Sequence, residues 1–436
     1  MMTLTEMPKY DAYKDSRVEW FGTIPESWCV KKLSHLFSNI GSGTTPATGN
    51  INFYNGDIPW LQTGDLTDGV INSTTKTISE RALKTHSTLK QYKVGSLVVA
   101  MYGATIGKVG LLNISTTTNQ ACCVLEQTDS VDMRFAFYLF MGFKSNIVAM
   151  GYGGGQPNIS QDLIRNLRFP FPHKQLQTAI ANFLDEKTAK IDDAIAIKER
   201  QIALLNERKQ ILIQQTVTQG LDLTVPMTDS GVTWIGKIPA HWEVRRSKFV
   251  FCQRKERARA DDVQLSATQA YGVIPQEQYE EMIGRRVVKI SFHLEKRKHV
   301  EIDDFVISMR SFQGGLERAW ASGCIRSSYV VLRPVNKDEI DAGFFSYMLK
   351  LPTYINALQM TASFIRDGQD LNFDNFAQVD LFIPPIEEQK AIFYAIQSKV
   401  DEINKSIALF TDQITKYQEY KITLINSAVT GKIKVV

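Results

Sequence analysis

The chain has 436 residues, of which 44% are hydrophobic and 22% are charged. This length predicts two to four domains, and the composition excludes a disordered chain. The apolar runs are far shorter than the ~20 residues that a membrane-spanning helix needs. Fifty Lys and Arg against 46 Asp and Glu give a net charge of +4, which alone neither indicates nor excludes a nucleic-acid partner.

The first segment of note is a tryptophan motif near the N-terminus. It starts at Asp15, reads DSRVEWFGTIPESWCVKKLSHLF, and holds Trp20 and Trp28 around a Gly-x-Ile-Pro turn. We expect these indoles to pack the turn, with docking of a partner as the alternative. The residues before the motif are polar and acidic, unlike a secretory signal, and the five cysteines form no C-x-x-C pair. We therefore expect reduced thiols and a cytoplasmic location.

The segment up to Pro172 predicts an α+β body. Its β-rich runs, GSLVVAM and ACCVLEQ, are followed by an apolar helical stretch, RFAFYLFMGFKSNIVAM. The string GATIGKVG, at Gly103–Gly110, resembles a phosphate loop, but it has three residues between its glycines where the Walker pattern has four, and Val109 replaces the Mg²⁺-binding Ser or Thr. We expect a tight turn, or a turn that carries Lys108 to a nucleic-acid backbone.

A long helix is predicted from Gln175, because apolar residues recur every three or four positions over about forty residues without Pro or Gly. A second such segment starts at Glu387, 212 residues later. Lys198, Lys209 and Lys421 interrupt the apolar seams. These interruptions indicate a specified pairing of the two helices. The alternative is that each helix packs on its own domain.

The second half repeats the first. A second tryptophan motif, DSGVTWIGKIPAHWEVRRSKFVF, starts at Asp229, 214 residues after the first, and a second α+β body follows. The chain is therefore predicted to be a pseudo-twofold tandem duplication, with domains at 1–172 and 219–384 and helices at 173–218 and 385–436. Two halves related by a pseudo-dyad make the helices antiparallel and suit two inverted half-sites on duplex DNA.

These motifs, together with the strings SGTTP, IPWLQTGDL and IPPIEEQKAI, resemble the specificity subunit of Type I restriction-modification enzymes over essentially the whole chain. One departure is local: the first half has PFPHKQLQTAI where the second half and the family pattern carry Pro-Pro and paired Glu. The resemblance implies two α+β target recognition domains separated by two long antiparallel helices that form a coiled-coil spacer. Each domain would read one half of a bipartite, asymmetric DNA target.

The resemblance also implies a non-catalytic subunit without a cofactor of its own. Two methyltransferase (modification) subunits that bind S-adenosylmethionine would methylate adenine, and motor-nuclease (restriction) subunits with ATP and Mg²⁺ would join them. One alternative is a free-standing DNA-binding scaffold or regulator without a methyltransferase partner, and another is a nucleotide-dependent enzyme built on Gly103–Gly110. Pro384-Pro385 lacks the Asn or Asp of a methyltransferase motif, and His293 and His299 lack metal-ligand spacing.

Contact with double-stranded DNA needs Lys and Arg for phosphates and polar side chains for base edges. Basic runs gather in the second body, at 244–260, 285–286 and 296–298. Superposing VVAMYGATIGKVG on VISMRSFQGGLER places Arg310 and Ser311 opposite Tyr102 and Gly103. Superposing TNQACCVL on IRSSYVVL likewise matches Asn119 and Gln120 to Arg326 and Ser327, which are different polar groups at equivalent places. Unlike half-sites would need such differences, although drift after duplication also produces them. The candidate DNA-binding residues are Thr44, Thr45, Lys108, Asn119, Gln120, Arg254, Arg257, Arg285, Arg286, Arg310, Ser311, Arg318 and Arg326.

Overall fold

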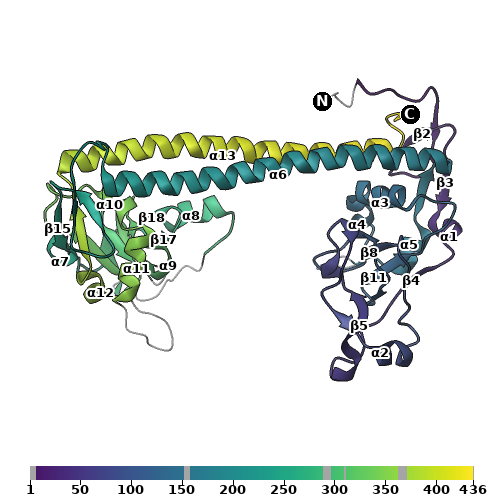
Figure 1. The fold of residues 1–436 in the computed structure, drawn as a ribbon, viewed down its shortest axis with the longest axis horizontal. Helices are drawn as coiled ribbons and strands as arrows, with labels where there is room; N and C mark the ends of the chain where they lie inside the picture. Colours follow the sequence, from purple (N-terminus) through teal and green to yellow (C-terminus); the bar gives the residue numbers. More distant parts are fainter. Residues whose placement is uncertain (1–5, 152–157, 288–295, 309–310, 362–370, 436) are drawn as a thin grey trace. The chain divides into compact units, whose positions relative to one another are not determined.

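The structure is a computed structural model, and it describes residues 6–151, 158–287, 296–308, 311–361 and 371–435. The chain divides into two compact units, which are Met1–Arg200 with Phe410–Val436, and Gln201–Leu409. Each unit holds one α+β body and a part of each of two long helices, α6 (Lys174–Gln219) and α13 (Ile386–Val429) (Figure 1). The predicted α+β class and the two long helices are confirmed.

The body of the first unit is built on a five-stranded sheet of order β4-β11-β8-β9-β6, in which only β6 and β9 pair in parallel. Leu97 and Val99 of β8 face a core that α3 completes, while Val98 and Ala100 face a second apolar cluster. Because both faces of the sheet are covered, its strands β8 and β11 are continuous apolar runs. The elements are β1 Tyr13–Asp15, β2 Thr23–Pro25, β3 Cys29–Lys32, α1 Leu33–Leu36, β4 Ile40–Ser42, β5 Tyr54–Leu61, β6 Gly69–Ile71, β7 Thr77–Ile78, α2 Glu80–Thr85, β8 Leu97–Ala100, β9 Val109–Leu112, β10 Thr117–Thr118, β11 Cys122–Leu125, α3 Met133–Gly142, α4 Lys144–Ala149, α5 Gln161–Asn166 and β12 Arg168–Phe171.

The body of the second unit has a four-stranded antiparallel sheet of order β16-β23-β20-β21, with the hairpin β17–β18 and the pair β19–β22 beside it. Phe305 and Ile307 of β20 face the main core, and Val306 faces a smaller one. The elements are β13 Met227–Asp229, β14 Lys237–Pro239, β15 Glu243–Arg246, α7 Ser247–Val250, β16 Phe251–Gln253, β17 Leu265–Thr268, β18 Gly272–Pro275, α8 Gln276–Ile283, β19 Lys298–Val300, β20 Phe305–Ile307, α9 Ser311–Gly314, β21 Glu317–Arg318, β22 Gly323–Ile325, β23 Val330–Pro334, α10 Ala342–Met348, α11 Pro352–Met360, α12 Phe373–Ala377 and β24 Asp380–Ile383.

The duplication seen in the sequence recurs in the strand pairing. The hairpin β1–β2 pairs Tyr13 with Pro25, and β13–β14 pairs Met227 with Pro239, each 214 residues further on. The tryptophan motifs begin within these hairpins in both units, and their second indoles, Trp28 and Trp242, are 0% and 5% exposed. These two indoles therefore pack the fold, as the simpler of the two interpretations expected.

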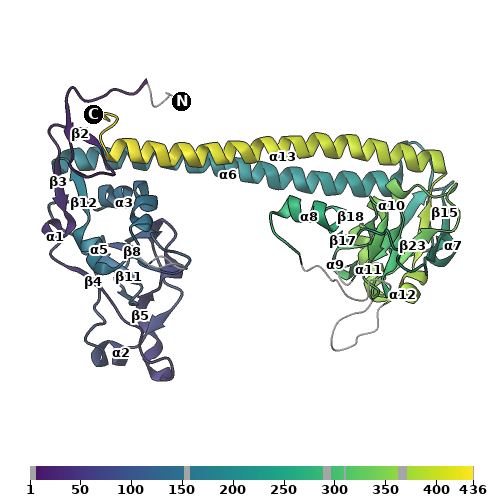
Figure 2. The same cartoon turned by 180° about the vertical axis from the view of Figure 1, so that it is seen from behind.

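The long helices pair in antiparallel orientation within each unit (Figures 1 and 2). In the first unit, Lys421 Nζ lies 2.7 Å from Asp192 and Lys198 lies 4.4 Å from the ring centre of Phe410. In the second unit, Lys209 Nζ donates to Asn404 Oδ1 at 3.1 Å. The three lysines that interrupt the apolar seams thus all contact the opposite helix, as a specified pairing requires.

The second long helix is shorter than the predicted segment 385–436. It ends at Val429, and Gly431 has a φ of 71°, in the left-handed region that terminates helices. A Cβ at Gly431 would lie 2.3 Å from Pro25 Cγ, so the chain end packs closely on the first tryptophan motif. None of the described helices combines the length and the apolar character that crossing a bilayer requires.

Candidate nucleic-acid interface

Four arginines line one groove in the second unit. The groove has a volume of about 870 Å³ and is formed by the β17–β18 hairpin, α8 with the residues after it, and the turn that follows β22. Its arginines are Arg285, Arg286, Arg297 and Arg326, and no Asp or Glu is among the described residues that line it. A groove of this charge attracts a polyanion.

The end of α8 delivers two of these arginines. The helix is followed by Gly284, whose φ of 65° is in the left-handed region. The chain therefore turns away after Ile283, and the exposed side chains of Arg285 and Arg286 lie just beyond the C-terminal end of the helix. Cations are favoured there because the helix dipole is negative at that end.

The other two arginines come from the neighbouring strands. Arg297 precedes β19, is 7% exposed and hydrogen-bonds to Cys324. Burial raises the pKa of the Cys324 thiol, and Arg297 partly opposes that shift. Arg326 is exposed in the turn after β22. The groove thus has one anchored guanidinium group and three exposed ones.

Neutral polar side chains complete the groove. Hydroxyl and amide groups of this kind can donate to or accept from the edges of bases. Tyrosine rings additionally offer flat surfaces on which a base or a sugar can pack. These groove residues are Ser266, Thr268, Gln269, Tyr271, Gln276, Tyr279, Ser308 and Tyr329.

Arg254, a predicted DNA contact, lies elsewhere. Its side chain is 3% exposed and donates to Asp304 at 2.7 Å, to Glu256 at 2.8 Å and to Glu301 at 2.7 Å. A guanidinium group held by three carboxylates inside the domain is not available to a phosphate. The structure therefore gives Arg254 a structural role, contrary to the expectation from the basic run.

Four further residues of the second unit were predicted to contact DNA, and none of them is among the described residues that line the groove. Arg257 is exposed and its backbone bridges to Lys298. Arg318 is held by Asp303 at 2.7 Å and lies 4.3 Å from the Trp320 ring, outside the arginine-lined groove. Ser311 is 1% exposed and accepts the N–H of Ser308, which differs from the exposed tip predicted for it. Arg310, predicted beside it, lies outside the described residues.

In the first unit the structure brings four of the predicted residues together. Thr44 and Thr45 follow β4, and Asn119 and Gln120 precede β11, which pairs with β4. Thr45 Oγ1 donates to Gln120 Oε1 at 2.6 Å. Gly43 makes this approach possible, since a Cβ there would lie 1.8 Å from the Thr118 carbonyl oxygen. The result is a polar cluster without a charged member.

Lys108 lies in the turn between β8 and β9. Gly103 and Gly107 have φ values of 83° and 75°, and a Cβ at Gly107 would meet Val148 and Lys144 of α4. Lys108 is followed directly by strand β9, whereas the lysine of a phosphate loop opens a helix. This geometry is that of a packed β-turn, as expected from the sequence.

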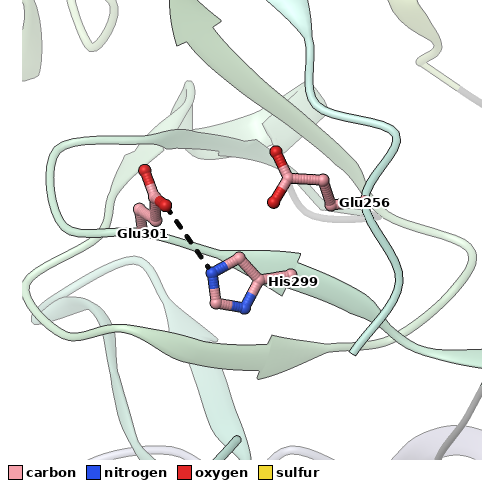
Figure 3. A group of neighbouring side chains, drawn as sticks. All are labelled: Glu256, His299 and Glu301. Atoms are coloured by element: carbon pink, nitrogen blue, oxygen red, sulfur yellow. Dashed lines mark ion pairs between the residues drawn. The ribbon is translucent and has the colours of Figure 1, made fainter. Parts of the chain in front are cut away.

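Sequence reasoning missed Arg297 as an individual site residue. The basic run at 296–298 signalled positive charge, but only the pairing of β19 with β22 shows that Arg297 lies in the groove. Sequence reasoning also rejected a metal site at His293 and His299. His293 is outside the described residues, whereas His299 is buried beside Glu256 and Glu301 (Figure 3).

Comparison with known proteins identifies relatives of this chain. The family model for the Type I restriction modification DNA specificity domain matches residues 25–207. The MjaIX specificity subunit of a Type I restriction enzyme from Methanocaldococcus jannaschii is 27% identical over 234 residues, and that alignment spans about half (52%) of either chain. The MjaVIII specificity subunit from the same organism is 23% identical over 435 residues, covering 94% of each chain.

Two solved structures share the fold. A chain from a structure of complex assembly and conformational transition in the type I R-M system has a TM-score of 0.69 at 13% identity, covering 94% of this chain and 99% of that one. The HsdS subunit from Thermoanaerobacter tengcongensis has a TM-score of 0.51 at 14% identity, covering 94% and 98%. The two-body, two-helix architecture is therefore shared at very low sequence identity.

Proposed function

Because this chain belongs to the family of type I restriction-modification specificity subunits, we propose that it is the subunit that reads DNA sequence in such a complex. In this proposal it is not catalytic, recognises a bipartite, asymmetric target, and directs adenine methylation and restriction by partner subunits. The bodies of the two units, 1–172 and 219–384, are the target recognition domains.

The observation that carries the proposal is the equivalence of two strand ends. Leu125 of β11 pairs with Leu97 of β8, and Leu332 of β23 pairs with Phe305 of β20 in the same way. Gln120 lies as many residues before Leu125 as Ser327 lies before Leu332, so these two positions are equivalent. The residue before each of them is a candidate DNA contact, Asn119 in the first unit and Arg326 in the second. The duplicated fold therefore carries its candidate groups at one shared place.

The chemistry at that place differs between the units. In the first unit the groups are the neutral side chains of Thr45, Asn119 and Gln120, and in the second they are Arg326 and Ser327, with Arg326 lining the arginine-rich groove. Amides suit adenine, and arginine suits guanine, in the major groove. Such a difference is what two unlike half-sites need.

Double-stranded DNA binds the two bodies, two methyltransferase subunits join the chain, and motor-nuclease subunits join through that complex in the cytoplasm. S-adenosylmethionine, ATP and Mg²⁺ belong to those partner subunits. A free-standing DNA-binding regulator, the alternative from the sequence, is not favoured because the relatives are specificity subunits.

Methylation mapping tests the assignment of half-sites. The chain is expressed with its methyltransferase, and modified adenines are mapped for the parent, Gln120→Ala and Arg326→Ala. Losing a bidentate base contact costs about 1–3 kcal/mol. Each variant should therefore relax one half of the target and leave the other half unchanged, with different halves affected in the two variants.

Arg246→Ala is the matched control, because Arg246 is an exposed arginine of the second unit that pairs with Asp380 and does not line the groove. It should leave the motif unchanged. If both test variants relax the same half, or neither changes the motif, the assignment of one half-site to each body is wrong.

A further inference from the structure

The second unit also contains a cluster of one histidine and two glutamates, which is not part of the lining of the arginine-lined groove. His299 lies on β19, Glu301 follows that strand, and Glu256 comes from the connection between β16 and β17. One ligand atom from each of the three side chains lies within 4.8 Å of the other two (Figure 3). Two segments, β19 with the residue after it and the β16–β17 connection, thus converge on one small space.

The His299 ring is held in one orientation. It is 2% exposed, and its Nδ1 lies 2.9 Å and 3.0 Å from the two carboxylate oxygens of Asp262. A carboxylate only accepts, so Nδ1 donates, and in the neutral ring the lone pair is on Nε2. Nε2 is buried without a hydrogen-bond partner among the described residues and faces Glu301 Oε1 at 3.9 Å. An acceptor nitrogen therefore faces an acceptor oxygen, and a cation between them would satisfy both.

The two glutamates are held in position by Arg254. Its Nη1 binds Glu256 Oε1 at 2.8 Å, its Nη2 binds Glu301 Oε2 at 2.7 Å, and Asp304 anchors the guanidinium from within the domain. The second oxygen of each glutamate is then left for another cation. Arg259, whose side chain is 54% exposed, now lies 3.2 Å from Glu256 Oε2 and 3.7 Å from Glu301 Oε1.

The charges of the cluster also favour a cation. Glu256, Glu301 and Asp304 contact the guanidinium groups of Arg254 and Arg259, Asp262 contacts the His299 ring, and Arg333 lies 3.7 Å from Glu256. Four carboxylates thus gather around three guanidinium groups among the described residues of the cluster.

We propose that Glu256, His299 and Glu301 form a binding site for a transition-metal dication such as Zn²⁺. One imidazole nitrogen and two carboxylate oxygens are suitable ligands for such an ion. Asp262 supplies the outer hydrogen bond that orients a metal-binding histidine, and Arg254 does the same for the carboxylates. Arg259 is exposed enough to move away when the metal binds. The ion would link the β16–β17 connection to β19. The ligand on β19, His299, is two residues after Arg297, which lines the groove.

The test uses the full chain, stripped with a chelator and titrated with Zn²⁺ by calorimetry without DNA. We expect one saturable site per chain, and Zn²⁺ well above its Kd should raise the Tm. Glu301→Gln and Glu256→Gln keep the shape of the side chain but remove a charged ligand, and each should weaken binding by at least tenfold. Glu243→Gln, an exposed glutamate of the same unit, is the control and should bind as the parent does.

A cysteine site is the main competing explanation, because Cys324 is the strand partner of His299 and is 3% exposed. Cys324→Ser should retain Zn²⁺ binding if the proposed ligands are correct. The proposal is overturned if the parent chain binds no Zn²⁺ at one equivalent, if both Gln variants bind like the parent, or if Cys324→Ser alone removes binding. Because no DNA is present, failure here leaves the proposed function unaffected.

Discussion

The side chain of Gln177 accepts the backbone N–H of Asp132 at 2.9 Å and donates to the carbonyl of Pro172 at 2.9 Å. In the second unit Gln389 accepts the N–H of Asp341 at 2.9 Å and donates to Pro384 at 2.7 Å. Each glutamine is in the first turn of a long helix, and each aspartate is the N-cap of a helix in its body, α3 or α10. The duplication has therefore kept the same hydrogen-bonded junction between body and helix.

Gln177→Leu should destabilise this junction in the first unit. Gln177 is 3% exposed, so the substitution leaves the Asp132 N–H and the Pro172 carbonyl without their partner. An unsatisfied buried polar group costs about 1–3 kcal/mol. Urea unfolding should show a loss of this size, whereas Gln175→Leu, at an exposed glutamine of the same helical turn, should show almost none. Equal losses in the two variants would mean that the junction contributes nothing specific.

Acid should weaken the same junction through Asp132. Burial acts to raise its pKa, but the hydrogen bond from Thr178 and the charge and N–H groups of Arg134 outweigh it, so the pKa is below the ordinary 3.8. A carboxylate with a lowered pKa stabilises the fold above its ordinary pKa, and this contribution is lost as the pH falls through the lowered value. The difference in unfolding free energy between the parent and Asp132→Asn should therefore shrink below pH 3.8 and be constant near neutrality. A difference that does not depend on pH would contradict this origin.

Features set by local sequence were predictable. The long helices follow from apolar periodicity, and the duplication follows from two motifs at nearly one offset. The segments PFPHKQLQ and IPPIEEQK at the two helix starts differ in sequence, but both contain the glutamine of the junction, Gln177 or Gln389. The sequence therefore indicated that the difference affects only the residues before this glutamine. The difference shows in one contact of the second half, where the indole N–H of Trp242 donates to Glu388 at 3.1 Å. The first half has Leu176 at the position of Glu388 and so lacks this acceptor.

Features set by long-range contacts were not predictable. A basic run cannot show which of its members is buried: Arg254 is held by Asp304 from 50 positions away, while Arg285 and Arg286 remain exposed. Ser311 aligned with a loop residue of the first unit, but the chain forms α9 there, and its hydroxyl bonds to the Ser308 N–H. The sequence showed the charge, and only the packing shows which charges face solvent.

The paired helices should set the gap between the two half-sites. One heptad adds about 10 Å at 1.5 Å per residue, or about three base pairs at 3.4 Å each. Seven residues inserted after Leu205 keep the pairing if seven more are inserted after Ile407, since Lys209 faces Asn404. Methylation mapping should then show the same bases with a longer gap. A folded, active complex with the original gap would contradict this role of the helices.

The duplication of the chain should also set the stoichiometry of its assembly with the methyltransferase. Each unit repeats the same tryptophan motif, junction and helix pairing, so any surface that a methyltransferase recognises on one unit has an equivalent on the other. Two equivalent surfaces on one chain predict two methyltransferase subunits per chain. Native mass measurement of the co-expressed complex should give this two-to-one ratio, and the chain alone should transfer no methyl group from S-adenosylmethionine to DNA. A saturated one-to-one complex would exclude equivalent docking, and methylation by the purified chain would exclude a non-catalytic subunit.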